Sequence, residues 1–160
     1  MQFIPEWAPN IHPLIIHFPI ALLVVAVFLD VVSVWLKKDW LRNSTLMMYF
    51  FGTLGAITAY FTGRIAANSV NPSFQAELTM SKHSDWALYT VIFFSIYTIL
   101  RIVFKNKLNP ENRIIHLAVL AVTVFGLFLL VSTADLGGKL VFKYGVGQFN
   151  HGLENSLNLK

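Results

Sequence analysis

The 160-residue chain contains no cysteine. This absence excludes disulfides, thiolate metal sites, iron–sulfur clusters and the covalent attachment of a c-type haem. Charged residues are also scarce, at 12% of the chain, against about 25% in soluble globular domains. The sequence shows no nucleophile constellation, phosphate-binding loop or pair of catalytic carboxylates. We therefore expect that the chain is neither a hydrolase nor a transferase.

Apolar residues, in contrast, make up 56% of the chain, and 14 of them are phenylalanines. A domain of this size cannot hide so much apolar surface from water, so we expect lipid to be its solvent. Four segments approach or exceed the ~20 residues needed to cross a bilayer: 13–36, 46–68, 84–104 and 114–134. We therefore predict one transmembrane domain over residues 1–160. Its fold is expected to be all-α, an antiparallel four-helix bundle with a short glycine-rich outer tail. No internal repeat is apparent.

The charges of the linkers predict the orientation of this bundle. The linkers 37–45 and 101–113 hold seven of the twelve lysines and arginines, and the positive-inside rule places such linkers in the cytoplasm. Both termini and the linker between spans two and three then face the periplasm. Because loop topology explains the net charge of +4, we expect no nucleic-acid partner.

This topology brings histidines from distant parts of the chain to the outer end of the bundle. His12 and His17 begin the first span, and His83 precedes the third. A haem iron needs two axial ligands on opposite faces of its macrocycle, and histidines on facing helices can supply them. We predict that His17 and His83 ligate a haem b, with His12 as the alternative to His17 and Met80 as a weaker alternative to His83.

Other residues at the outer end fit the same hypothesis. Span two carries small residues at Gly55, Ala59 and Gly63, which leave room for a porphyrin plane, although helix packing alone also explains them. Arg64 and Lys82 are candidates for charge-assisted hydrogen bonds to the propionates.

Two alternatives to haem remain open. His12, His17 and His83 could instead hold zinc or copper. The chain could also be a structural subunit of a membrane complex that binds no cofactor.

Two further features of the sequence are an intramembrane acid and a glycine-rich tail. At the inner end, Asp30 lies inside a span, and intramembrane acids are functional candidates. We expect it to form a proton path or an ion pair with His116, or with Lys37 as another partner. The glycines of LGGKLVFKYGVG are read as turns flanking a short LVFKY strand.

Several motifs together resemble a bacterial family of four-span membrane domains of unknown function. They are HPLIIHFPIALL, the Thr62–Gly63 pair, His83, and ADLGGKLVFKYGVG. The resemblance rests on these positions: His12, Pro13, His17, Pro19, Gly63, His83, Gly137, Gly138, Gly145 and Gly147. Many relatives look as though they carry a histidine where this chain has Tyr144.

The resemblance has functional implications. Some members of the family look fused to c-type cytochrome domains, which implies electron transfer in the bacterial cytoplasmic membrane. A periplasmic cytochrome c or quinol, and a larger redox complex, are the implied partners. We therefore predict a b-type haem-binding membrane subunit that transfers electrons at the periplasmic side.

Overall fold

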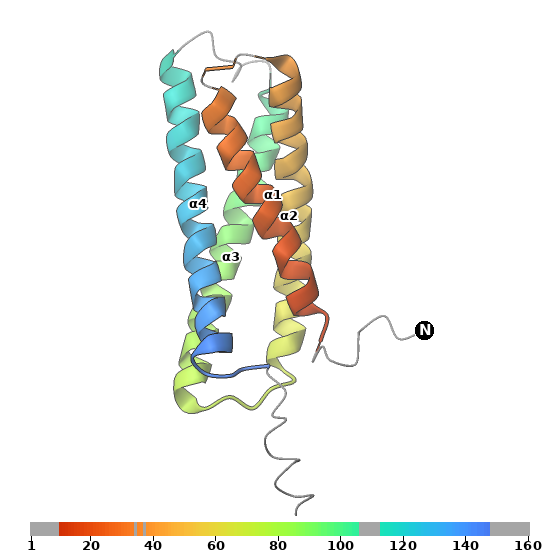
Figure 1. The fold of residues 1–160 in the computed structure, drawn as a ribbon, viewed down its shortest axis with the longest axis vertical. Coiled ribbons are helices and arrows are strands. Elements are labelled where there is room, and N and C mark those ends of the chain that lie inside the picture. The colour runs from red at the N-terminus through yellow and green to blue at the C-terminus, as the bar shows by residue number, and fades with distance from the viewer. Residues whose placement is uncertain (1–9, 34, 37, 106–112, 148–160) are drawn as a thin grey trace, which may run out of the picture.

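The computed structural model describes residues 10–33, 35–36, 38–105 and 113–147. Within these ranges the chain forms four helices and no strand. The helices are α1 (His12–Ser33), α2 (Asp39–Ala67), α3 (Phe74–Val103) and α4 (Arg113–Phe142) (Figure 1). All four are long and apolar enough to cross a membrane. The predicted all-α four-helix bundle is confirmed.

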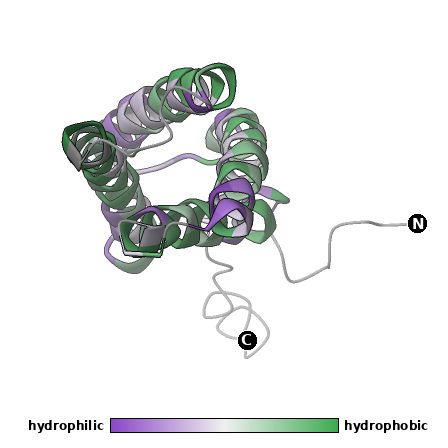
Figure 2. Ribbon diagram, turned by 90° about the horizontal axis from the view of Figure 1, so that it is seen from above, coloured by the Kyte–Doolittle hydropathy of each residue, from purple (hydrophilic) through white to green (hydrophobic). Residues whose placement is uncertain are grey.

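The helices run alternately up and down and occupy the corners of a square when seen along the bundle (Figure 2). α1 packs on α2 and α4, and α3 packs on the same two helices, so α1 and α3 lie diagonally opposite each other. The histidine end is the end at which α1 and α3 begin, and it carries His12 and His83. The ion-pair end is the opposite one, which carries Asp30 and Arg101.

Large apolar side chains cover the outside of the bundle. Phe28 is 63% exposed and Phe61 is 61% exposed, whereas Leu23, Tyr49 and Phe94 are fully buried. Such a surface would be a liability in water, but it suits the hydrocarbon of a bilayer. Polar side chains instead turn inward, and the buried threonines are Thr45, Thr53, Thr90, Thr98 and Thr123.

Three helices extend beyond the apolar segments that predicted them. α2 begins at Asp39, before the predicted start at 46, and α3 begins at Phe74, ten residues before 84. Met80, Lys82 and His83 therefore lie within α3, not before it. The extensions are polar, and ion pairs along the helix such as Arg42–Asp39 (3.1 Å) help them to stay helical.

The predicted LVFKY strand is wrong, because α4 continues through Leu140 and Phe142. Lys139 pairs with Asp135 one turn earlier, at 2.5 Å, and Leu140 packs into the interior with 8% exposure. Both contacts favour continuation of the helix. The turn comes later, where Gly145 (φ 66°) and Gly147 (φ 77°) adopt backbone angles that only glycine takes readily.

The glycines of span two belong to the seam between α1 and α2. A Cβ added to Gly52 would lie 2.8 Å from Leu23, and one added to Gly55 would lie 3.2 Å from Pro19. At Gly63 the nearest atom is the His12 ring carbon Cε1, at 2.9 Å. The small residues thus let α1 approach closely, and the His12 ring covers the surface of Gly63 that was predicted to face a porphyrin.

Candidate functional site

At the histidine end, His12 on α1 is hydrogen-bonded to α2, and His83 on α3 is hydrogen-bonded to α4. His83 Nδ1 lies 3.0 Å from the backbone carbonyl of Thr133 on α4. A carbonyl only accepts hydrogen bonds, so Nδ1 carries the proton of the neutral ring. Nε2 of His83 is therefore left with its lone pair, which is the form that ligates metals.

His12 has an equivalent arrangement. Its Nδ1 lies 3.2 Å from the Thr62 hydroxyl on α2. That hydroxyl donates to the carbonyls of Thr58 (3.0 Å) and Ala59 (3.1 Å). Because the hydroxyl proton is already used, Thr62 accepts the Nδ1 proton, and Nε2 of His12 also keeps its lone pair.

His12 and His83 lie on the same faces of their diagonal helices as the buried Asp30 and Arg101, five helical turns away. Both histidines are half-buried. Each also lies against a glycine of the neighbouring helix. A Cβ on Gly137 would lie 3.1 Å from Cε1 of His83, as one on Gly63 would meet His12. Close packing and the Nδ1 hydrogen bonds together fix the direction of each ring.

The other residues predicted for this site lie at its edge. His17 is exposed on the outside of α1, five residues from His12 and on a different face of the helix. Arg64 is exposed and donates to the Ser84 hydroxyl at 3.4 Å, and Lys82 is exposed nearby on α3. The structure therefore brings His12, and not His17, towards His83.

The part of the chain that the structure describes holds no group of three histidines, cysteines or carboxylates able to bind a metal. A three-histidine zinc or copper site built from His12, His17 and His83 is not assembled there, because His17 points outward.

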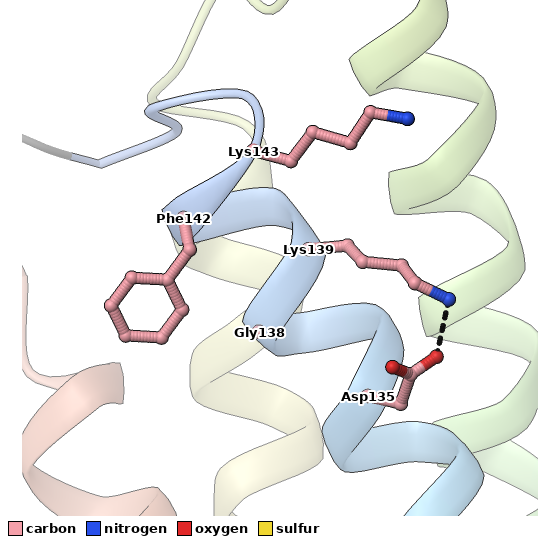
Figure 3. Close-up of a pocket in the computed structure, with 5 residues that line it drawn as sticks. All are labelled: Asp135, Gly138, Lys139, Phe142 and Lys143. Atoms are coloured by element: carbon pink, nitrogen blue, oxygen red, sulfur yellow. Dashed lines mark hydrogen bonds and ion pairs between the residues drawn. The ribbon is translucent and has the colours of Figure 1, made fainter.

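The last turns of α4 carry a shallow surface pocket on the outside of the bundle (Figure 3). Its lining comes from the end of α4 and the residue that follows it: Asp135, Gly138, Lys139, Phe142 and Lys143. Just beyond it, the Thr79 side chain on α3 and the adjacent Lys143 lower the pKa of Tyr144 from its ordinary value of 10.0.

At the ion-pair end, Asp30 and Arg101 form a buried, two-pronged salt bridge between α1 and α3. Arg101 Nη1 lies 2.9 Å from Oδ2 of Asp30, and Nη2 lies 2.9 Å from Oδ1. The remaining helices also donate to Oδ2, through the Tyr49 hydroxyl on α2 (2.8 Å) and the Thr123 hydroxyl on α4 (3.2 Å). One carboxylate therefore receives hydrogen bonds from all three other helices.

Tyr97 completes this polar cluster. Its hydroxyl accepts from Arg101 Nη1 at 2.6 Å and lies 2.5 Å from the Thr123 hydroxyl. The guanidinium carbon of Arg101 lies 5.6 Å from the centre of the Tyr49 ring and 5.5 Å from that of Tyr97. These contacts compensate for the removal of two charges from water.

Comparison of the chain with known protein families identifies one family that matches most of its length. The family described as "Predicted membrane protein (DUF2231)" matches residues 8–150, which include both ends of the bundle. The chain belongs to this family. No curated protein and no solved structure matches it. The family establishes a membrane protein of unknown function, and the fusion to cytochrome domains stays an expectation.

Sequence reasoning missed most of the ion-pair end of this DUF2231 protein. It expected His116 or Lys37 as the partner of Asp30, whereas the structure pairs Asp30 with Arg101. Lys37 and the side chain of His116 lie outside the described residues. Arg101, which the positive-inside count includes in the linker 101–113, lies in the last turn of α3 and is 8% exposed.

The two polar ends are separated by apolar packing. Thr133 and Thr90 share a hydrogen bond of 2.9 Å on the histidine side, while Tyr97 belongs to the ion-pair cluster. Leu23, Phe94 and Leu130 fill the interior between these groups. A separate buried pair, Thr53 and Thr98, shares a hydrogen bond of 2.9 Å. None of the hydrogen bonds described for these side chains joins the histidine end to the ion-pair end.

Proposed function

We propose that this DUF2231 protein is a b-type haem-binding subunit that transfers electrons at the periplasmic face of the bacterial cytoplasmic membrane. The observation that carries the proposal is the pair formed by His12 and His83. Both lie on the faces of diagonal helices that are buried further along the bundle, and each Nδ1 is hydrogen-bonded to an adjacent helix. Haem, when bound, would supply one-electron chemistry.

The chemistry of this donor set fits a bis-histidine haem. Imidazoles ligate iron through the nitrogen that has no proton, and a hydrogen bond at the other nitrogen fixes the tautomer and strengthens the ligand. His12 and His83 both meet this requirement. The proposal therefore assigns His12, in place of His17, as the partner of His83. Arg64 and Lys82 remain the candidates for the propionates, because they are cations exposed at the same end.

The charge distribution supports the orientation. Even without the buried Arg101, the linkers 37–45 and 101–113 hold six of the twelve lysines and arginines, against five in the rest of the chain, so the positive-inside rule favours a cytoplasmic location for the ion-pair end. The histidine end would then face the periplasm, where a cytochrome c or a quinol could exchange electrons with it.

The test is a reduced-minus-oxidised spectrum, recorded on native membranes and on the detergent-purified protein. We expect sharp Soret and α bands that disappear in His12→Ala and in His83→Ala. His17→Ala is the matched control, because His17 lies on the same helix but faces outward, and it should keep both bands. Haem loss in His17→Ala with retention in His12→Ala would overturn the ligand assignment.

A wild-type protein without haem in both preparations would overturn the proposed function itself. Elemental analysis then separates the two alternatives, because stoichiometric zinc or copper would favour a metal-binding module. A protein with neither haem nor metal would favour a cofactor-free structural subunit.

A further inference from the structure

The buried positions of α1 recur in α3 at a constant offset. Asp30 and Arg101, which form the salt bridge, are 71 residues apart, and so are His12 and His83. Every other buried position of α1 also has a buried counterpart in α3 at this offset. The pairs are Pro19 with Thr90, Leu23 with Phe94, Ala26 with Tyr97, and Val27 with Thr98.

The same offset relates α2 to α4. It connects Gly55 to Gly126 and Thr62 to Thr133, and each histidine lies 50 residues before the threonine that anchors it. The hairpins α1–α2 and α3–α4 are therefore related by an approximate two-fold axis. The match of buried positions is close between α1 and α3 but partial between α2 and α4, where the buried Leu46 and Thr53 correspond to Leu117 and Val124, each 50% exposed. Few residue identities repeat, so the sequence does not show this relation.

The salt bridge joins equivalent positions across that axis. In each hairpin, 18 residues separate the histidine from the charged residue. Eighteen residues make five full helical turns and span roughly 27 Å, so both residues lie on the same face of their helix. Because α1 and α3 run parallel, pairing Asp30 with Arg101 also brings His12 level with His83.

We propose that Asp30 and Arg101 are positioning residues for the His12–His83 pair, acting from the opposite end of the bundle. α1 and α3 do not pack on each other directly, and the bidentate geometry restricts both sliding and rotation of one helix against the other. The consequence for haem ligation rests on the proposed function, whereas the registration of α1 and α3 does not.

The absence of cysteine makes a direct test available. Spin labels at Leu14→Cys and Asp85→Cys would lie at equivalent exposed positions near the two histidines, and double electron–electron resonance would report the distance between them. With Asp30 and Arg101 intact we expect a single narrow distribution. Asp30→Ala or Arg101→Ala should broaden or shift it, while the double exchange Asp30→Arg with Arg101→Asp should restore it at least partly.

Thr53→Val is the matched control. Thr53 is buried and bonds to Thr98 at 2.9 Å, which links α2 to α3 but not α1 to α3. We expect this variant to leave the distance distribution unchanged. If Asp30→Ala proves too unstable to purify, Asp30→Asn keeps the size and one acceptor oxygen but removes the charge, and it should broaden the distribution to a smaller extent.

An unchanged distribution in helical, folded Asp30→Ala or Asp30→Asn protein would overturn the proposal. So would equal broadening in Thr53→Val, since that result would mean that any loss of stability disturbs the histidine end. If haem is present, electron paramagnetic resonance should also show a several-fold loss of the low-spin bis-histidine signal in Asp30→Ala. If haem is absent, the distance measurement still decides the positioning role, so the two proposals can fail separately.

Discussion

At the scale of the residue, the buried polar side chains of this bundle are arranged so that their hydrogen bonds are satisfied. A carboxylate and a guanidinium are costly to bury, and removing one partner of a buried pair leaves an uncompensated charge. Asp30 and Arg101 avoid this cost because Tyr49, Tyr97 and Thr123 complete their hydrogen bonds. The polar side chains therefore specify which faces of four largely apolar helices turn inward.

Two glycines at the histidine end should respond differently to the same substitution. A Cβ on Gly63 would lie 2.9 Å from the His12 ring, whereas one on Gly138 would meet nothing within 4 Å. We expect Gly63→Ala to cost about 1–3 kcal/mol through overpacking. Gly138→Ala should be neutral or stabilise the helix by about 0.5–1 kcal/mol.

The stability of both glycine variants is measured by unfolding in mixed detergent micelles, followed by circular dichroism. Gly138→Ala serves as the control for the general effect of adding a methyl group to a helix at this end. Equal losses of stability at the two positions would contradict the contact between Gly63 and His12.

Sequence reasoning found the histidines and Asp30 but not their partners. The first span is apolar on every side, so the sequence does not show which of His12 and His17 faces inward. Arg101 follows an apolar run and resembles a linker charge. Arg101 is buried because α3 lies diagonally opposite α1, which carries its partner Asp30. The only indication in the sequence is that Asp30 follows His12 by 18 residues and Arg101 follows His83 by the same number.

At the scale of the element, the sequence predicted that four membrane-spanning helices exist, but it did not predict how long each helix is. Hydropathy detects the part of a helix that crosses hydrocarbon. It does not detect the polar turns that continue α2, α3 and α4 outside that layer, such as Asp39–Arg42 and Asp135–Lys139. Glycine at 137 and 138 suggested a turn, but the surrounding helix tolerates both.

Cysteine labelling can test the end of α4. Leu140 is 8% exposed and Phe142 is 89% exposed, because successive helical residues differ by 100° in direction. We expect maleimide to react much faster with Phe142→Cys than with Leu140→Cys. A strand would place these alternate residues on the same side, so similar rates at 140 and 142 would contradict the helix.

At the scale of the whole molecule, we predict the orientation in the membrane from the distribution of charge. We expect Ser69→Cys to be labelled by a membrane-impermeant maleimide in intact spheroplasts, since it follows α2 at the histidine end. Lys38→Cys, at the ion-pair end, should react only after the membrane is permeabilised. The cysteine-free parent chain provides the background. Reversed accessibility would place the histidines in the cytoplasm.

The opposite signs at equivalent positions also determine which hairpins can assemble. Two copies of α1–α2 would bring two carboxylates face to face inside the bilayer, and two copies of α3–α4 would bring two guanidiniums together. Like charges at these positions therefore disfavour the pairing of a hairpin with its own duplicate and favour the pairing of unlike hairpins. Because both hairpins lie in one chain, they are always made together.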